Sequence, residues 1–211
     1  MAMTDKSKGT RGISAFIVEK GTPAIRIGKM EKKLDIKGSA TCELIFENCR
    51  IPKENMLGKE GQGFKVAMKT LDGGRIGIGA QALGIAQGAL DETVKYVKER
   101  KQFGRSIAQF QNTQFQLADM HTQTEAARML VYKAACKKDA GEEYGLDAAM
   151  CKLYAAEAAM NVAAKAVQLH GGYWYTREYA VERMMREAKI TEIYEGTSEV
   201  QRMVISANIL K

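Results

Sequence analysis

The clearest helical pattern of the chain reads LDAAMCKLYAAEAAMNVAAKAVQLHGG over residues 146–172. Apolar side chains recur in it at intervals of three or four residues, which places them on one face of a helix. The pattern stops at Gly171-Gly172, and glycine is the residue that most often follows a helix. The stretch therefore predicts a long helix with one apolar stripe, formed by Leu146, Met150, Leu153, Met160, Ala164 and Val167.

Helical spacing also governs the region before this stretch. Apolar residues repeat at intervals of three or four from Phe64 to Val97, and a second helix is expected from about Ile107 to Lys138, ended by Ala140-Gly141. The first of these helices carries six glycines, each of which weakens a helix by up to about 1 kcal/mol relative to alanine. Two explanations stay open for them: close packing of helices, or a ligand lying against the backbone. The six are Gly73, Gly74, Gly77, Gly79, Gly84 and Gly88.

Two shorter helices are expected after the quoted stretch, near Glu178–Ala188 and Ser198–Leu210. The tetrapeptide Ser198–Gln201 fits a capping box, in which the first and fourth side chains satisfy free backbone N–H groups. This places Glu195–Thr197 on the loop just before the last helix. Because both prolines lie in the first quarter of the chain, no proline breaks these helices. The pattern predicts a mainly α fold, an antiparallel four-helix-type bundle.

The first sixty residues indicate strands instead. Ile13–Val18 is short, apolar and β-branched, and Ile25 and Ile27 alternate with polar residues. In Cys42–Glu47 the side chains of residues 42, 44 and 46 share one face, as in a half-buried strand. Three strands form a poor sheet by themselves, and Met1 opens without a start signal for a domain. We therefore expect a partial β-domain that belongs to a longer protein.

A glycine-rich segment, Leu57–Gly63, marks the expected boundary between the two kinds of structure. We place a remnant of a β-domain over residues 1–58 and a helical bundle domain over residues 59–211.

The formal net charge of +7 suits phosphate-bearing small molecules better than nucleic acid. Basic residues are scattered among acids, as in Glu99-Arg100-Lys101, and aromatic residues, 7% of the chain, do not interleave with a basic stripe. The four cysteines lack C-x-x-C spacing, so neither a zinc site nor any other metal site is expected. No apolar run approaches the length of a membrane span, and no secretory leader is recognised. These features are typical of a reducing, cytosol-like compartment with free thiols.

Four segments could carry chemistry, although each has a structural explanation. Glu195 lies between an aromatic residue and a glycine, just before the expected N-terminus of a helix. An acid at that position can also simply help to cap the helix. Gln168–Gly172 serves as a helix stop or allows the backbone to approach a ligand. Asp72 and Arg75 have the spacing of a helical ion pair. Arg100–Arg105 can be a solvated helix end.

Taken together, these segments resemble the acyl-CoA dehydrogenase family. Leu71–Arg75, Glu99–Gly104, Gln168–Gly172 and Ile193–Ser198 occur in the order and spacing of that family, and Cys42–Pro52 resembles its middle domain. The similarity covers essentially the whole chain and is greatest to the short-chain, butyryl-CoA-specific type of bacteria. It implies an FAD-dependent α,β-dehydrogenation of a short-chain acyl-CoA, butyryl-CoA to crotonyl-CoA. In that reaction a carboxylate removes the α-proton while the β-hydrogen leaves as hydride to the flavin.

The resemblance also implies roles for residues around the substrate. Glu195 stands where the short- and medium-chain members carry their catalytic base, and Gly74 stands where isovaleryl- and long-chain members carry theirs. This combination favours the short- or medium-chain type. Asp72 and Arg75 match residues that contact the CoA part of the substrate, and Gly196 adjoins the acyl end.

The same comparison implies FAD-binding residues and partners. Family members share their flavin sites between subunits, so a homo-oligomer is expected, usually a homotetramer, with an electron-transferring flavoprotein as the electron acceptor. A cytoplasmic location is favoured, with the mitochondrial matrix as the alternative. The FAD-binding positions are Arg100, Phe103 and Gln111, then Gln168, Gly171 and Gly172, all facing a neighbouring subunit, and Thr197 and Glu199 in the same active site.

Two other functions remain open. The chain lacks residues that match the family's amino-terminal helical domain, so the 211 residues alone are expected to fold with little or no dehydrogenase activity. A catalytically inactive helical assembly module derived from the family is the main alternative. A protein that binds only the CoA anion, through Arg75 and its basic surface, is the third.

Overall fold

The computed structural model describes the backbone of residues 1–211 and all side chains except that of Trp174. It separates into two compact units, Met1–Leu71 and Asp72–Lys211. Helix α1 (Gly63–Glu99) begins in the first unit and continues into the second.

The first unit consists of short antiparallel strands, as the sequence predicts. A three-stranded sheet has the order β1-β2-β5, and β3 pairs with β4 in a separate two-stranded sheet. Pairing of Ala15 with Leu57 joins two segments of this unit that are far apart in the sequence. The elements are β1 (Ala2–Met3), η1 (Lys6–Gly12), β2 (Ile13–Phe16), β3 (Ile25–Met30), β4 (Cys42–Phe46), η2 (Lys53–Asn55) and β5 (Met56–Leu57).

The predicted burial of one face of β4 is wrong. Leu44 is 58% exposed and Phe46 is 52% exposed, although both lie in the expected strand. The strand itself forms because its backbone pairs with β3, from Ile25 opposite Phe46 to Met30 opposite Cys42. A two-stranded sheet has no second layer of its own, so alternation produced a strand without producing a covered face.

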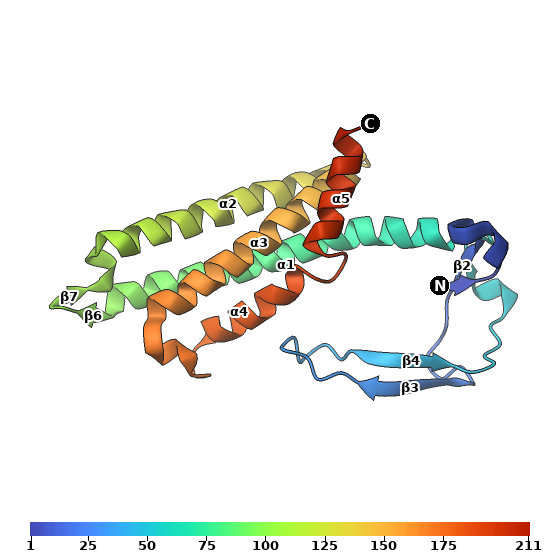
Figure 1. Ribbon diagram of the computed structural model, residues 1–211, viewed down its shortest axis with the longest axis horizontal. Helices are drawn as coiled ribbons and strands as arrows, with labels where there is room; N and C mark the ends of the chain where they lie inside the picture. The colour runs from blue at the N-terminus through green and yellow to red at the C-terminus, as the bar shows by residue number, and fades with distance from the viewer. The chain divides into compact units, whose positions relative to one another are not determined.

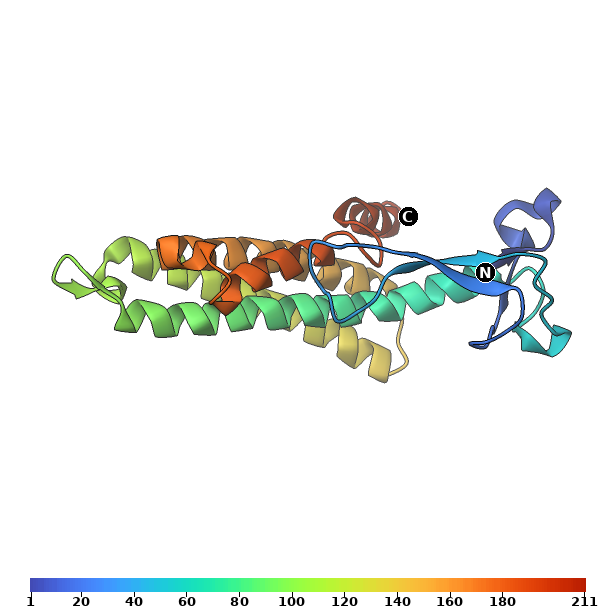
Figure 2. The ribbon, with the colours of Figure 1, turned by 90° about the horizontal axis from the view of Figure 1, so that it is seen from below.

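The second unit is an antiparallel helical bundle, which confirms the predicted architecture. Figures 1 and 2 show α1 to α4 running alongside one another, with α5 crossing the bundle at a steep angle. A small hairpin and a 3-10 turn connect α1 to α2, and a second 3-10 turn connects α3 to α4. The elements are β6 (Lys101–Gln102), β7 (Arg105–Ser106), η3 (Ile107–Gln109), α2 (Gln111–Asp139), α3 (Gly145–His170), η4 (Gly171–Tyr175), α4 (Ala180–Thr191) and α5 (Ser198–Ile209).

Two predicted helix ends are confirmed by their backbone conformation. Gly141, after α2, has φ of 72°, and Gly171, after α3, has φ of 66°. Both values lie in the left-handed region, which glycine adopts without steric cost. The glycines that stop the sequence pattern therefore stop the helices.

The predicted capping box at the start of α5 is wrong by one residue. The N-cap is Thr197, whose hydroxyl accepts a hydrogen bond from the backbone N–H of Val200 at 3.4 Å. Gln201 does not complete a box, because its side-chain amide donates instead to the carbonyl of Gly196 at 2.9 Å. Contacts with the preceding loop thus decide which of two adjacent hydroxyl residues caps the helix.

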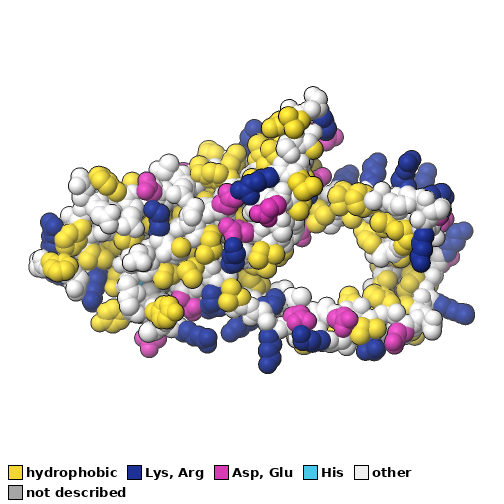
Figure 3. Space-filling model, in the orientation of Figure 1, with side chains coloured by type: hydrophobic (Ala, Val, Ile, Leu, Met, Phe, Trp, Pro, Cys, Tyr) yellow, Lys and Arg dark blue, Asp and Glu magenta, His cyan; other side chains and the backbone are white. Residues whose placement is uncertain are grey.

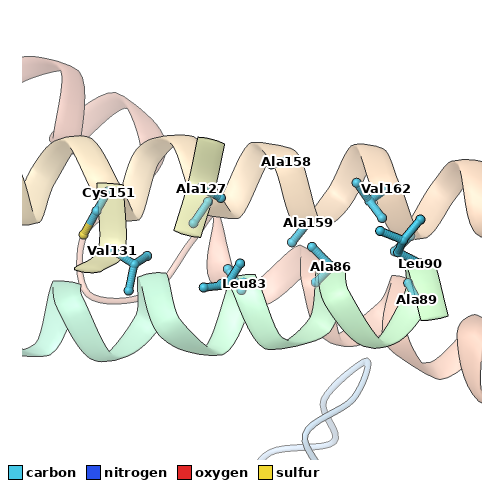
Figure 4. Close-up of a cluster of buried hydrophobic side chains, with 14 of the residues drawn as sticks. Leu83, Ala86, Ala89, Leu90, Ala127, Val131, Cys151, Ala158, Ala159 and Val162 are labelled. Atoms are coloured by element: carbon cyan, nitrogen blue, oxygen red, sulfur yellow. The ribbon is translucent and has the colours of Figure 1, made fainter. Parts of the chain in front are cut away.

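The core lies where α1 and α3 face each other through small side chains. Figure 4 shows Leu83, Ala86 and Leu90 of α1 opposite Ala159 and Val162 of α3. The alanines at this contact are fully buried. Because the distance between packed helices depends on the side chains between them, alanine allows a close approach.

Two of the six glycines of α1 are explained by this packing. A β-carbon at Gly79 would lie 3.3 Å from both Sγ of Cys151 and a methyl group of Val131. A β-carbon at Gly88 would lie 3.2 Å from Cε of Met184. The first of the two explanations left open by the sequence, close helix packing, therefore holds at these positions.

Many charged side chains on the outside of the helical unit form pairs of opposite sign. On the face seen in Figure 3, lysines and arginines alternate with acids around α5. Arg186 forms a two-pronged contact with Glu182 at 2.8 and 2.9 Å, and Lys189 pairs with Glu192 at 2.6 Å. No helix among the described residues is long and apolar enough to cross a membrane.

The glycines of α1 provide a direct test of the packing. A β-carbon at Gly77 would meet no atom within 4 Å, so Gly77→Ala should raise the free energy of unfolding by about 0.5–1 kcal/mol through helix propensity. Gly79→Val should lower it by about 1–3 kcal/mol, because the new methyl groups overpack the contact with Cys151. Urea denaturation followed by circular dichroism measures both changes. Equal effects of the two substitutions would contradict the assigned packing.

Candidate active site

The loop between α4 and α5 has an unusual backbone. Glu195 has φ of 55° and Gly196 has φ of 92°, so two consecutive residues are left-handed. This region suits glycine but is uncommon for a residue with a side chain. The loop is closed by a hydrogen bond of 3.0 Å from the N–H of Ser198 to the carbonyl of Glu192. Other contacts must offset the cost of the Glu195 conformation.

Two buried side chains donate hydrogen bonds to this loop. Nζ of Lys152, on α3, donates to the carbonyl of Gly196 at 2.6 Å. Nε2 of Gln201, on α5, donates to the same carbonyl at 2.9 Å and to that of Glu195 at 3.2 Å. Both residues are fully buried. A β-carbon at position 196 would lie 2.8 Å from Nε2 of Gln201, so the contact requires glycine.

The carboxylate of Glu195 lies against a bare stretch of helix α1. A β-carbon at Gly74 would be 2.5 Å from Oε2 and 2.9 Å from Cδ of Glu195. No real β-carbon tolerates such a distance, so any other residue at position 74 would displace the carboxylate. The absence of a side chain at Gly74 therefore makes room for the carboxylate of Glu195 rather than for a neighbouring helix.

The same turn of α1 carries the predicted ion pair. Nη1 of Arg75 donates to Oδ1 of Asp72 at 2.6 Å, which confirms the spacing argument. The Arg75 side chain is buried, and among the described residues its Nε atom has no hydrogen-bond partner. A buried guanidinium donor without a partner is unusual and calls for a structural or functional explanation.

Burial perturbs the ionisable groups around the loop. It lowers the pKa of Lys152 to about 8, and the charge of Arg75 adds to that effect, whereas Glu192, Glu195 and Glu199 oppose it. Burial also raises the pKa of Tyr194, whose hydroxyl is hydrogen-bonded to the side-chain carbonyl of Gln81.

The sequence analysis missed Lys152, Gln201 and Tyr194. The helical spacing of alanines could have indicated that Lys152 is buried. Ala148, Ala155 and Ala156 lie one turn away from it on the same side of the helix, and all three are buried. A lysine among buried alanines at this spacing indicates a buried ammonium.

A second cluster lies at the end of the bundle where α1 turns into α2. Phe103 is 92% exposed at the tip of the β6–β7 hairpin, with φ of 53°, followed by Gly104 with φ of 79°. Two successive positive φ values are typical of a two-residue hairpin turn, so the helix-end interpretation is wrong for residues 101–106. The guanidinium of Arg100 lies 5.0 Å from the centre of the Tyr173 ring.

An open groove adjoins this hairpin. It is lined mainly by the ends of α1 and α3 and by η4. A β-carbon at Gly171 or Gly172 would meet no atom within 4 Å, so the backbone there is accessible. The groove residues are Tyr96, Arg100, Gln102, Ile107, Leu169, His170, Gly171, Gly172, Tyr173 and Thr176.

The predicted site residues thus fall into two separate places. Figure 1 shows the hairpin and η4 at one end of the bundle, while the loop before α5 lies farther along α1. Asp72, Arg75 and Gly196 lie with Glu195 in the loop site, and Thr197 and Glu199 begin α5 beside it. The remaining positions lie at the hairpin end: Arg100, Phe103, Gln111, Gln168, Gly171 and Gly172.

Known proteins match this chain along its whole length. The family model for the acyl-CoA dehydrogenase C-terminal domain matches residues 61–210. The short-chain specific acyl-CoA dehydrogenase of Clostridium acetobutylicum is 64% identical over 210 residues, which covers 100% of this chain and 55% of the relative. The chain spans about half the length of the curated relatives that it matches.

Solved structures agree. Butyryl-CoA dehydrogenase from Megasphaera elsdenii has a TM-score of 0.99 and 58% identity, covering 100% of this chain and 55% of that one. A chain in a structure described as the electron transferring flavoprotein of Acidaminococcus fermentans has a TM-score of 0.99 and 61% identity, with the same coverage.

The histidine beside the groove predicts a dependence of stability on pH. Burial lowers the pKa of His170 from its ordinary 6.5, so the unfolded chain binds a proton more readily than the folded one. The folded state that keeps His170 neutral has its full stability above pH 6.5. That stability is lost as the pH falls from 6.5 through the lower pKa of His170 in the folded chain.

Urea denaturation between about pH 8 and pH 5 measures this loss. We expect His170→Gln to lose less stability on acidification than the parent chain. The control is His121→Gln, which changes the chain's other histidine at an exposed site and should behave like the parent. Parallel pH profiles for all three proteins would show that His170 does not carry the effect.

Proposed function

This chain belongs to the acyl-CoA dehydrogenase family, and on that premise we propose that it supplies the base of an FAD-dependent dehydrogenase for short-chain acyl-CoA thioesters, converting butyryl-CoA to crotonyl-CoA. The observation that carries the proposal is the carboxylate of Glu195 held against Gly74. The 64% identity to a short-chain specific relative supports the substrate class. The family match from residue 61 supports a helical domain over residues 59–211, after a remnant of the β-domain.

Glu195 is assigned the removal of the α-proton. A carboxylate is a weak base in water, but a thioester α-proton becomes more acidic when its carbonyl accepts hydrogen bonds. Among the described residues, the backbone N–H of Glu195 donates no hydrogen bond, so it is free to donate to that carbonyl. The base and a carbonyl donor would then belong to the same residue.

Substrate contacts are assigned to the same end of α1. Arg75 has a buried Nε donor without a partner among the described residues, which suits an oxygen of the CoA thioester. Asp72 holds the guanidinium through the 2.6 Å contact and fixes its direction. Gly196, next to the base, is assigned to the acyl end of the substrate.

The exposed residues at the hairpin end fit FAD. Arg100 offers the rigid fork of donors that suits a pyrophosphate, and the bare backbone of Gly171 and Gly172 allows close approach. Phe103 offers an exposed aromatic face for adenosine. When bound, FAD supplies the acceptor for the hydride that leaves the β-carbon. Gln111 and Gln168 are assigned to the same group, and Thr197 and Glu199 to the flavin next to Glu195.

Because these two sets lie apart in one chain, the hairpin end is assigned to the flavin of a neighbouring subunit. This assignment requires a homo-oligomer, which we propose to be a tetramer. An electron-transferring flavoprotein is the proposed electron acceptor, supported by the similarity to a chain in the Acidaminococcus fermentans structure. The bacterial relatives favour the cytoplasm over the mitochondrial matrix.

A visible spectrum tests the function. The chain is compared with a fusion that joins it to the part of the Megasphaera elsdenii enzyme outside its match. After FAD addition and desalting, the fusion should retain flavin absorbance, which butyryl-CoA should bleach without oxygen, while the 211-residue chain should retain little. A fusion that holds flavin and is not bleached would instead support the inactive assembly module.

Glu195→Gln tests the base in the same fusion. The amide keeps the shape of the side chain and removes its basicity, so kcat should fall by about 10²- to 10⁴-fold. Size-exclusion chromatography should show an unchanged oligomer. Glu142→Gln, at an exposed position after α2, serves as the control and should keep full activity. Comparable activity of the two variants would remove Glu195 from the mechanism.

A further inference from the structure

Lys152 is a buried ammonium on a helix otherwise packed with alanine. It is fully buried, and its Nζ atom reaches the carbonyl of Gly196, which lies 44 residues later in the chain. We propose that Lys152 is a positioning residue for the catalytic loop: together with Gln201 it fixes the Gly196 peptide and so holds the carboxylate of Glu195 over Gly74. This inference rests on the proposed function of Glu195.

The geometry of the Gly196 peptide supports this role. Its carbonyl accepts from Lys152 at 2.6 Å and from Gln201 at 2.9 Å, so donors from two helices, α3 and α5, fill both acceptor positions. Any rotation of that peptide breaks both hydrogen bonds. This peptide links Gly196 to Thr197 and so lies one residue after Glu195, close enough for the two donors to restrain the backbone from which the carboxylate projects.

The conformation of Glu195 needs such a restraint. Its φ of 55° is uncommon for a residue with a side chain, and backbone of this kind persists only where surrounding contacts hold it. Gln201 also donates to the carbonyl of Glu195 at 3.2 Å. A loop released from these donors would relax and carry the carboxylate away from Gly74.

Stability alone does not explain a lysine at this position. Burial of an ammonium is unfavourable, and replacement of buried charges by apolar side chains of similar size is often neutral or stabilising. Methionine would fill a similar volume, and the Gly196 carbonyl would keep its bond from Gln201. A residue that costs folding energy at a functional loop is typical of positioning roles.

The charges around Lys152 fit this role. It faces Arg75 from α1, Glu192 and Glu195 from the loop, and Glu199 from α5. The three acids favour the charged ammonium and Arg75 opposes it, while burial lowers the pKa of Lys152 to about 8. At neutral pH the loop is therefore held by a cation.

The test replaces Lys152 by methionine and measures the loop directly in the 211-residue chain. Hydrogen exchange followed by mass spectrometry should show faster exchange for residues 193–199 and unchanged exchange in the core of α3. The melting temperature should stay the same or rise. Lys165→Met is the matched control, because Lys165 lies on the same helix with a side chain that is 36% exposed. The control should leave the loop unchanged.

The same variants in the fusion give the catalytic readout. Lys152→Met should lower kcat by about 10- to 100-fold, as misplacement of a reacting group does, with a smaller change in KM for butyryl-CoA. A purely structural lysine would instead lower the melting temperature or prevent folding, and either result overturns the proposal. Unchanged loop exchange or full kcat also overturns it. If the parent fusion itself fails to oxidise butyryl-CoA, the proposed function fails, while loop exchange still decides whether Lys152 positions the loop.

Discussion

Close contact between α1 and α3 through alanine and glycine determines where the loop site forms. Ala86 and Ala159 face each other in the core, and Gly79 leaves room for Cys151 and Val131. Larger residues along this contact would separate the helices. Gly74, on α1, would then move away from the carboxylate of Glu195, whose loop is held on α3 and α5 by Lys152 and Gln201. Helix packing and site geometry are therefore one constraint.

The glycines of α1 serve two purposes along one helix. At Gly79 and Gly88 the missing side chain is replaced by atoms of neighbouring helices, whereas at Gly74 it is replaced by the carboxylate of Glu195. A residue at position 74 and a residue at position 195 direct their side chains to nearly the same point, so only one of them can be large.

Local signals made most of the helices predictable. Apolar spacing correctly predicts a helix over residues 146–170, but the stripe that it selects is not the buried face, because Ala164 is exposed and the buried residues of α3 are mainly alanines. Gly141 and Gly171 end helices by adopting positive φ, and that prediction depends only on neighbouring residues. The prediction of the N-cap of α5 failed because Thr197 and Ser198 are both suitable caps. The hydrogen bond from Gln201 to the loop carbonyl of Gly196 decides between them. The predicted burial of one face of β4 was wrong for a related reason: a strand face is covered only when a second layer of structure packs on it. Lys152 was missed because the helical period can indicate which face of α3 is buried but cannot identify the Gly196 carbonyl, far along the sequence, to which Lys152 donates.

The separation of the two clusters has a physical consequence under the proposed function. Phe103 is 92% exposed at the tip of a hairpin, where its ring is accessible to the flavin of a neighbouring subunit. The Glu195 carboxylate, by contrast, is held within its own chain by Lys152 and Gln201 acting through the backbone. Folding of a single chain then positions the base, whereas the flavin-binding residues at the hairpin end meet their flavin only when subunits assemble. An oligomer built on this plan links cofactor retention to subunit contact and leaves the geometry of the proton transfer independent of it.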